Sequence, residues 1–371
     1  MKRIKIILSA VLISCILISA SGCRNSVQKE TESQNSVKSN ESTKSDKATP
    51  SKNFPDPYDK SVFALDTFIN LRLYSDNAES AAQLAADRIT ELEDILSVTN
   101  ENSDVSILNN NTGEPVEVDD DTFNVINTAI DVSAVTDGAL DISVYPIVKL
   151  WGFTTDEHKV PNQSDIDKEL KKVDYTKIVI DKNSQSVQLA KNMQIDLGAV
   201  AKGYISEDVK NLLKENGVES AVLSFGGNIQ TIGTKNGELW KVGIKYPFTE
   251  DSFAILSVEE TAVVTSATDQ RYFEENGKMY HHIIDPKSGF PVDNGTFSTT
   301  VVCESGAKAD ALSTSIFVMG IDKAKELYKN SDDFEFVILD EEDNVYVTTG
   351  LKDNFKLSDS YNYLNVEYVE K

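Results

Sequence analysis

Alternating apolar and polar positions dominate the chain after residue 60 and predict a body rich in strands. From residue 61 to 74 the odd positions are mostly apolar, which is the period of a half-buried strand. Shorter strand-like runs follow near 177–180, 186–189, 220–224, 240–245, 254–258, 262–266, 298–303, 334–339 and 345–348. Asn276-Gly277 separates two further runs and favours a two-residue hairpin turn.

Other segments repeat apolar residues every three to four positions and predict helices. They are 81–96, with Asp76 or Asn77 as a cap, 122–135, after the acidic residues 119–121, and 200–215, which stops at Asn216-Gly217. A further helix follows the strand 298–303, and another precedes the strand 334–339. Strands outnumber helices and many neighbours look antiparallel, so we expect an α+β fold in one compact body over residues 61–371.

The first 60 residues predict export and a tether. Lys2, Arg3 and Lys5 precede an apolar stretch that closes at Cys23, a pattern typical of a bacterial lipoprotein signal and too short for a stable membrane span. We therefore expect a signal peptide over residues 1–22, lipidation of Cys23, and a protein anchored on the extracytoplasmic face of a bacterial membrane. Residues 23–60 hold almost no large apolar side chains, so we expect a disordered tether.

Charge and cysteine content narrow the function. The chain has 60 acidic and 36 basic residues, a net charge of −24, which argues against nucleic acid as a partner. A bound metal could still attract a phosphate ester to so acidic a protein. Only Cys303 remains in the predicted body, so we expect no intrachain disulfide, and too few Cys and His residues remain for an ordinary structural zinc site.

Asp310 and Thr314 lie four residues apart on a predicted helix of small residues, so their side-chain oxygens point from one face. A carboxylate and a hydroxyl suit a hard cation such as Mg²⁺. The alternative is that Asp310 sits on a solvated helix start while Thr314 bonds back to a backbone carbonyl.

Four further clusters are poor in bulky side chains and rich in oxygen or glycine: residues 137–144, 196–203, 224–228 and 281–289. In the second, a turn before a helix and the ammonium of Lys202 could approach an anionic ligand. An ordinary turn with Asp196 as helix cap is the alternative.

The last cluster contains adjacent histidines at a predicted strand end. On a strand, one of His281 and His282 can face a pocket while the other faces solvent. A neutral imidazole could take a proton from a hydroxyl near pH 7, or it could serve the structure alone. The third histidine, His158, lies in a charged loop.

In this order the clusters resemble the ApbE family of flavin transferases. The resemblance rests on residues 196–203 (DLGAVAKG), 226–228 (GGN), 282–286 (HIIDP) and 309–314 (ADALST), and it spans residues 62–350. It implies a T-fold-like body and FAD:protein FMN transferase activity. In that reaction Mg²⁺ binds the FAD diphosphate, FMN is joined through its phosphate to a threonine or serine hydroxyl of a flavoprotein subunit of a membrane redox complex, and AMP is released.

The resemblance also implies roles for single residues. Asp310 and Thr314 match the magnesium ligands, with the backbone carbonyl of Ala199 as a third, and Asp310 and His282 match the catalytic positions, His282 as the group that activates the acceptor hydroxyl. Leu65 stands where the family often has methionine, and Thr99 where an aromatic residue is usual. The positions that match FAD contacts are Leu65, Thr99, Ala139, Leu140, Asp141, Asp196, Lys202 and Ile283.

Two other functions remain open from the sequence. Water in place of the acceptor hydroxyl would give a hydrolase that yields FMN and AMP. A tether followed by a globular body is also how non-enzymatic flavin-binding or solute-binding lipoproteins are built. The pair Asp310 and Thr314 favours an enzyme, because a pure binding protein does not need it.

Overall fold

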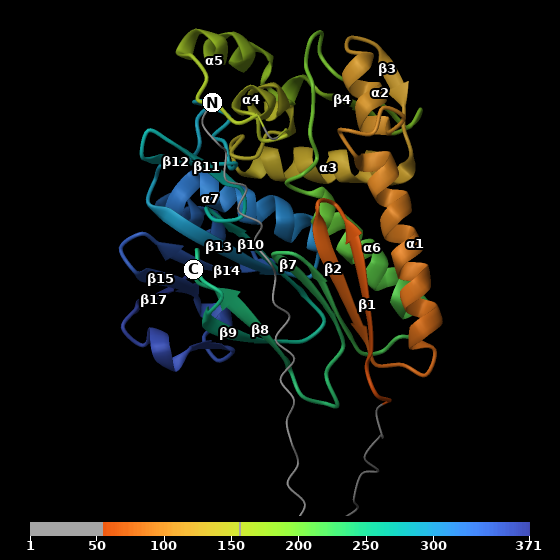
Figure 1. The fold of residues 1–371 in the computed structure, drawn as a ribbon, viewed down its shortest axis with the longest axis vertical. Coiled ribbons are helices and arrows are strands. Elements are labelled where there is room, and N and C mark those ends of the chain that lie inside the picture. Colours follow the sequence, from red (N-terminus) through yellow and green to blue (C-terminus); the bar gives the residue numbers. More distant parts are fainter. Residues whose placement is uncertain (1–54, 156) are drawn as a thin grey trace, which may run out of the picture. The chain divides into compact units, whose positions relative to one another are not determined.

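One sheet of nine strands organises the computed structural model, which describes residues 55–155 and 157–371 (Figure 1). Its order is β1-β2-β6-β7-β10-β13-β14-β15-β17. All neighbours are antiparallel except β15 and β17, which run parallel. The strands are β1 (Tyr58–Ala64), β2 (Thr67–Leu73), β6 (Ala221–Phe225), β7 (Asn228–Ile232), β10 (Ala262–Ala267), β13 (Thr296–Cys303), β14 (Phe334–Asp340), β15 (Asn344–Thr348) and β17 (Asn365–Val369).

One hydrophobic core lies where apolar side chains of the sheet pack against four helices: α1 (Ala78–Leu96), α3 (Asp120–Val135), α6 (Ala201–Glu215) and α7 (Gly306–Lys329). A second core lies between the nine-stranded sheet and a smaller sheet of order β16-β9-β8. Its strands are β8 (Trp240–Lys245), β9 (Ser252–Val258) and β16 (Phe355–Leu357). The large sheet therefore lies between helices and a second sheet.

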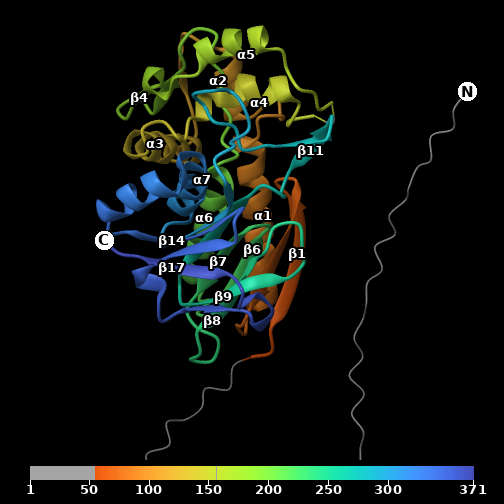
Figure 2. The same ribbon diagram turned by 90° about the vertical axis from the view of Figure 1, so that its left-hand side faces the viewer.

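Shorter elements gather at the end of the fold away from β8 and β9 (Figures 1 and 2). They are α2 (Asp104–Asn110), α4 (Tyr145–Trp151), α5 (Gln163–Glu169) and a sheet of β3 (Pro115–Glu117), β5 (Ser186–Gln188) and β4 (Val179–Asp181). A separate hairpin joins β11 (Tyr272–Glu275) to β12 (Lys278–His281). Single 3₁₀ turns occupy Ile142–Val144, Leu170–Lys172, Tyr175–Lys177, Thr349–Leu351 and Asp359–Tyr361.

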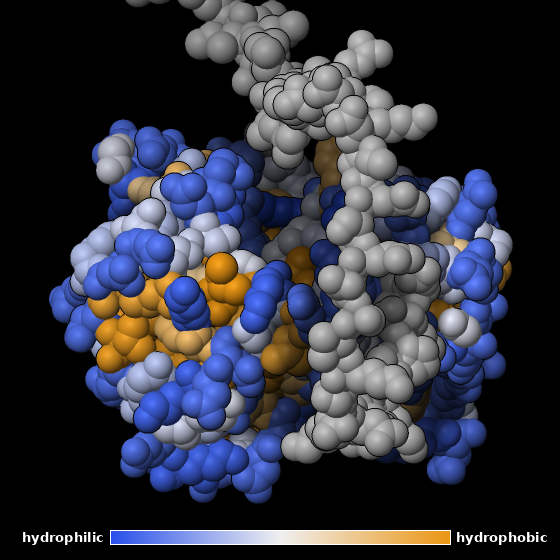
Figure 3. Space-filling model, turned by 90° about the horizontal axis from the view of Figure 1, so that it is seen from below, coloured by the Kyte–Doolittle hydropathy of each residue, from blue (hydrophilic) through white to orange (hydrophobic). Residues whose placement is uncertain are grey.

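The face of the protein seen from below is largely hydrophilic and carries apolar patches (Figure 3). Among residues 55–155 and 157–371, the structure contains no helix long and apolar enough to pass through a bilayer. The predicted signal peptide, Cys23 and nearly all of the predicted tether lie outside the described residues.

Local signals located several elements correctly. Asp119 caps α3 by accepting a hydrogen bond from the backbone of Asp121, and α6 ends just before Asn216-Gly217. Asn276-Gly277 forms the predicted hairpin turn between β11 and β12. The helix that carries Asp310 continues to Lys329 through a kink at Gly320 (φ 74°), where the sequence predicted two helices.

The single strand predicted over residues 61–74 is wrong. Leu65 and Asp66, with φ of 53° and 56°, form a turn that divides this segment into the strands β1 and β2. Because Ala64 then pairs with Thr67, the in–out alternation changes phase at the turn. Phe63, expected on the buried face, is instead 65% exposed.

Arg88 on α1 ties three helices together. Its guanidinium lies 2.9 Å from the carboxylate of Asp208 on α6, 2.6 Å from that of Asp121 on α3 and 3.0 Å from that of Glu91 on its own helix. The hydroxyl of Tyr204 donates a further hydrogen bond of 2.6 Å to Asp121. Two half-buried carboxylates, those of Asp121 and Asp208, thus share one cation.

Replacing Arg88 with methionine is expected to lower the free energy of unfolding by about 2 kcal/mol, because it leaves these carboxylates without their partner. Urea denaturation measures the change. The matched control is Arg72→Met, since Arg72 pairs with Asp59 on the open surface of β1 and β2, where the loss should stay within about 0.5 kcal/mol. Equal losses in the two variants would contradict the role given to Arg88.

Candidate active site

The candidate residues gather where α6 and α7 cross. A Cβ on Gly203 would lie 2.1 Å from the carbonyl oxygen of Gly306, and one on Gly306 would lie 2.5 Å from that of Gly203. The two backbones are therefore in direct contact, which only glycine permits. Asp310, one turn after Gly306, consequently reaches the first turn of α6.

Asp310 is buried, and its Oδ2 accepts the backbone N–H of Gly203 at 2.8 Å. In a regular helix that N–H would bond to the carbonyl of Ala199, four residues earlier. Within the described residues no backbone N–H reaches the Ala199 carbonyl. The crossing thus brings the Asp310 carboxylate and a free carbonyl of Ala199 to the same helix turn. Asp310 does not sit on a solvated helix start, since Ser305 caps α7.

Thr314 lies one turn after Asp310 and is half-buried. Its Oγ1 is 3.4 Å from Oγ of Ser266 on β10, which also hydrogen-bonds Oγ of Ser313 at 2.8 Å. Burial raises the pKa of Asp310, while the charge of Lys202 and the N–H of Gly203 act in the opposite direction. Asp310, Thr314 and Ala199 offer three kinds of oxygen, the donor atom that hard cations prefer.

A metal at this crossing would depend on such mixed oxygen donors. In residues 55–155 and 157–371 no three side chains of His, Cys, Asp or Glu are grouped so that they could hold an ion. A hydroxyl and a backbone carbonyl therefore have to complete the ligand set.

Asp196 shapes the turn that leads into α6. Its Oδ1 accepts the backbone N–H of Gly198 at 2.9 Å, so it closes a local turn and does not cap the helix. Burial raises its pKa, which the Gly198 N–H and the charge of Lys202 oppose. The N–H of Asp196 donates to the carbonyl of Ile142 at 2.9 Å and so joins this turn to the segment 139–142.

In that segment Ala139, Leu140 and Asp141 are all buried. The carboxylate of Asp141 accepts the N–H and hydroxyl of Ser143 at 2.8 and 2.6 Å and the N–H of Tyr175 at 3.0 Å. Burial nevertheless raises the pKa of Asp141. Its side chain is engaged in holding its own loop.

His281 is buried and belongs to the core. It therefore does not face solvent, as one histidine of the pair was expected to do. Its Nδ1 accepts the N–H of Ile283 at 3.3 Å, hence its Nε2 carries the proton and donates to the carbonyl of Val292 at 2.9 Å. The ring packs edge-on against Phe317, with centroids 5.6 Å apart. Ile283 itself is also buried.

His282 points the other way and is half-buried. Its Nδ1 lies 3.2 Å from the carbonyl oxygen of Arg271, which can only accept, so Nδ1 carries the proton and Nε2 keeps a free lone pair. Burial lowers the pKa of His282 to about 3, assisted by the nearby charges of Arg271 and Lys202. The imidazole is therefore uncharged at neutral pH.

Arg271 joins the site although the sequence did not single it out. Its guanidinium lies 3.4 Å from the carboxylate of Asp66, in the turn that also contains Leu65. The hairpin register about Asn276-Gly277 places Arg271 opposite His282. The position of Arg271 beside His282 could therefore have been predicted from the hairpin. Thr99, unlike Arg271, forms no interaction with the other candidate residues within the described part of the chain. Its hydroxyl forms a hydrogen bond of 3.0 Å with the hydroxyl of Ser97.

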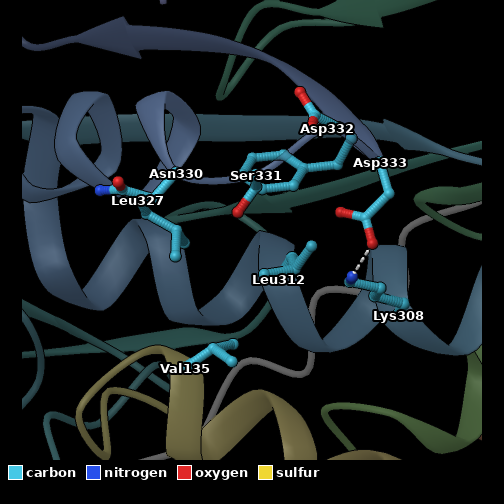
Figure 4. Close-up of a pocket in the computed structure, with 9 residues that line it drawn as sticks. Val135, Lys308, Leu312, Leu327, Asn330, Ser331, Asp332 and Asp333 are labelled. Carbon is cyan, nitrogen blue, oxygen red and sulfur yellow. Dashed lines mark hydrogen bonds and ion pairs between the residues drawn. The ribbon is translucent and has the colours of Figure 1, made fainter.

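A cleft of about 280 Å³ opens between the end of α3 and α7 (Figure 4). Lys308 and Leu312 line it from the face of α7 opposite Asp310, and Lys308 pairs there with Asp333. None of the candidate catalytic, metal-binding or FAD-contacting residues lines this cleft. It is separate from the candidate site.

Replacing Gly203 with alanine is expected to destabilise the protein by about 3 kcal/mol or more and to displace Asp310, because the new methyl group overlaps the backbone of Gly306. Thermal unfolding and Mg²⁺ titration measure the two effects. Asn211→Ala, on the exposed face of the same helix, is the control and should leave both unchanged. A Gly203→Ala protein of normal stability would contradict the close crossing.

The fold and site together define a class of α+β protein in which clustered oxygen donors, a lysine and a neutral imidazole suit a phosphate-bearing ligand held through a divalent cation. The ApbE family model matches residues 65–338, and the chain belongs to the ApbE family. The predicted α+β body of mostly antiparallel sheet with packed helices is confirmed.

Similar proteins cover most of the chain. The FAD:protein FMN transferase of Klebsiella pneumoniae (strain 342) is 34% identical over 307 residues, which are 82% of this chain and 95% of that protein. The protein of the same name from Treponema pallidum (strain Nichols) is 29% identical over 325 residues, covering 82% and 90%. The crystal structure of the ApbE protein from Thermotoga maritima has a TM-score of 0.73 at 29% identity and covers 84% of this chain and all of that one. The flavin transferase ApbE from Vibrio cholerae gives 0.71 at 25% identity, covering 83% and 99%.

Proposed function

We propose that the chain is a FAD:protein FMN transferase, which moves FMN from FAD to a threonine or serine hydroxyl of an acceptor protein and releases AMP. Curated relatives of that name match over most of their length. The observation that carries the proposal is the hydrogen bond from Gly203 to Asp310, because it leaves the Ala199 carbonyl free beside a buried carboxylate.

Mg²⁺ is the ion that this set of oxygens suits. Asp310, Thr314 and the carbonyl of Ala199 would hold it, and when bound it would neutralise the charge of the FAD diphosphate. The ammonium of Lys202 provides a second positive charge at the same helix start. The proposed FAD contacts are Leu65, Thr99, Ala139, Leu140, Asp141, Asp196, Lys202 and Ile283.

The acceptor hydroxyl oxygen bonds to the phosphorus of the FMN half while the bond from that phosphorus to the bridging oxygen breaks, and AMP leaves with the bridging oxygen. Nε2 of His282 takes the hydroxyl proton. The Arg271 carbonyl holds the opposite ring nitrogen and so keeps Nε2 free for this step. Such a transfer requires alignment and charge neutralisation more than covalent help from the protein.

The test incubates the full chain with FAD, Mg²⁺ and a flavoprotein subunit of a membrane redox complex that was produced without its covalent FMN. Mass spectrometry should find FMN joined to the subunit, and AMP should appear in equal amount. Free FMN and AMP with an unmodified subunit would favour a hydrolase. FAD binding without AMP release would favour a binding protein.

We further propose that Cys23 carries lipid and anchors the enzyme on the extracytoplasmic face of a bacterial membrane. The support is the basic start, the apolar stretch and the small residues before Cys23. Cys23→Ser should move the protein from the membrane fraction to the soluble fraction. An unchanged distribution would contradict the lipid anchor.

A further inference from the structure

Two phenylalanines stand exposed on the β1–β2 hairpin. Phe63 and Phe68 are directly opposite each other across the strands and are 65% and 67% exposed. Their rings meet edge to face, with centroids 5.2 Å apart. They lie on the face of these strands that the helices do not cover. Large apolar side chains that remain in water side by side mark interaction sites.

A second exposed aromatic pair lies beyond Arg271. Phe248, in the turn between β8 and β9, and Tyr272, at the start of β11, are 46% and 42% exposed, with ring centroids 5.3 Å apart. The N–H of Phe248 donates to Asp269 at 2.9 Å, and its ring packs on Phe297. Contacts with the fold therefore hold this pair in its exposed position.

Both pairs adjoin the group that positions His282. Arg271 immediately precedes Tyr272, and its guanidinium reaches Asp66 in the turn that closes the hairpin of Phe63 and Phe68. The carbonyl of Arg271 accepts both the backbone N–H of His282 at 3.0 Å and the ring Nδ1 at 3.2 Å. Arg271 thus links both pairs to the backbone that holds the ring of His282.

We propose that Phe63, Phe68, Phe248 and Tyr272, the aromatic rim, bind an extended segment of the acceptor protein next to its reactive hydroxyl. The proposal rests on the proposed function, which requires a protein chain close to His282. Exposed aromatic side chains are the usual anchors of protein contacts. A net charge of −24 disfavours the main rival, an anionic membrane surface.

The experiment compares two double variants of the full chain, Phe63→Ser with Phe68→Ser and Phe248→Ser with Tyr272→Ser. The control is Tyr368→Ser, an exposed aromatic residue on β17 at the opposite edge of the large sheet. The probe is the flavoprotein subunit without covalent FMN. We expect each double variant to raise the KM for the subunit about tenfold or more, with little change in kcat. Affinity for FAD should stay unchanged, and the control should match the unsubstituted protein.

Three results would overturn the proposal. An unchanged KM for the subunit would remove the aromatic rim from acceptor binding, and weaker FAD binding would assign it to the nucleotide. If KM is unchanged in solution while binding to phosphatidylcholine–phosphatidylglycerol vesicles falls, the rim is a membrane contact. If a double variant fails to fold, the single changes Phe68→Ser and Tyr272→Ser carry the same comparison. Failure of the proposed function would appear separately, as an unsubstituted protein that never modifies the subunit.

Discussion

Asp310→Asn is expected to slow FMN transfer by about 10³-fold or more and, at the same time, to make the metal-free protein more stable. Asparagine keeps an oxygen that can accept the N–H of Gly203 but removes the charge that a divalent cation needs. The gain in stability follows from the raised pKa of Asp310. Between the ordinary pKa of 3.8 and the raised native value, the native state binds more protons than the unfolded state. The contribution of Asp310 to folding stability therefore falls as pH rises through this interval, and above it the charged carboxylate destabilises the native state.

Thermal unfolding at neutral pH measures this effect. Mg²⁺ should raise the melting temperature of the unsubstituted protein, because it binds only the folded state, and should not raise that of Asp310→Asn. Asp333→Asn is the control, since that carboxylate pairs with Lys308 on the opposite face of α7. A variant that keeps either the Mg²⁺-dependent shift or normal turnover would refute the metal assignment.

His282→Gln is expected to lower the rate of FMN transfer by about 10²- to 10⁴-fold while affinity for FAD and Mg²⁺ persists, because it removes the acceptor of the hydroxyl proton. Stopped assays with the acceptor subunit, together with FAD titrations, separate the two quantities. His281→Gln is the matched comparison and should reduce stability more than rate, since its ring bridges Ile283 and Val292 inside the core. Equal loss of rate in both variants would contradict the different roles of the two histidines.

The lowered pKa of His282 also predicts a pH dependence. The ordinary value is 6.5 and the native value is about 3, so between them the unfolded state binds more protons. Stability should therefore fall as pH falls below 6.5, and His282→Gln should flatten that decline. Melting temperatures measured from pH 8 down to pH 4.5 test this. Identical slopes in the two proteins would show that His282 titrates normally.

The sequence predicted elements whose signals are local. Asp119 caps α3, Asn216-Gly217 ends α6, and Asn276-Gly277 turns the β11–β12 hairpin, each through chemistry of a few adjacent residues. The turn at Leu65-Asp66 carried a weaker signal, because aspartate tolerates positive φ but leucine rarely adopts it. Strand β7 escaped notice because it buries Asn228, Gln230 and Thr231, so its pattern does not look apolar.

The candidate site was predictable to a similar extent. The spacing of Asp310 and Thr314 correctly indicated a shared helix face. Spacing could not indicate that Gly203, 107 residues earlier, would donate to Asp310, because that contact depends on how two helices cross. Only the resemblance placed the two motifs in one site. The engagement of Asp141 within its own loop was likewise invisible before the fold was known.

In the first turn of α6, the N–H of Gly203 donates to the carboxylate of Asp310, which is synthesised 107 residues later. Incomplete chains, in which α7 is still missing, lack the oxygen pair proposed to bind Mg²⁺. The proposed metal site therefore forms only after α7 has been synthesised and has packed against α6.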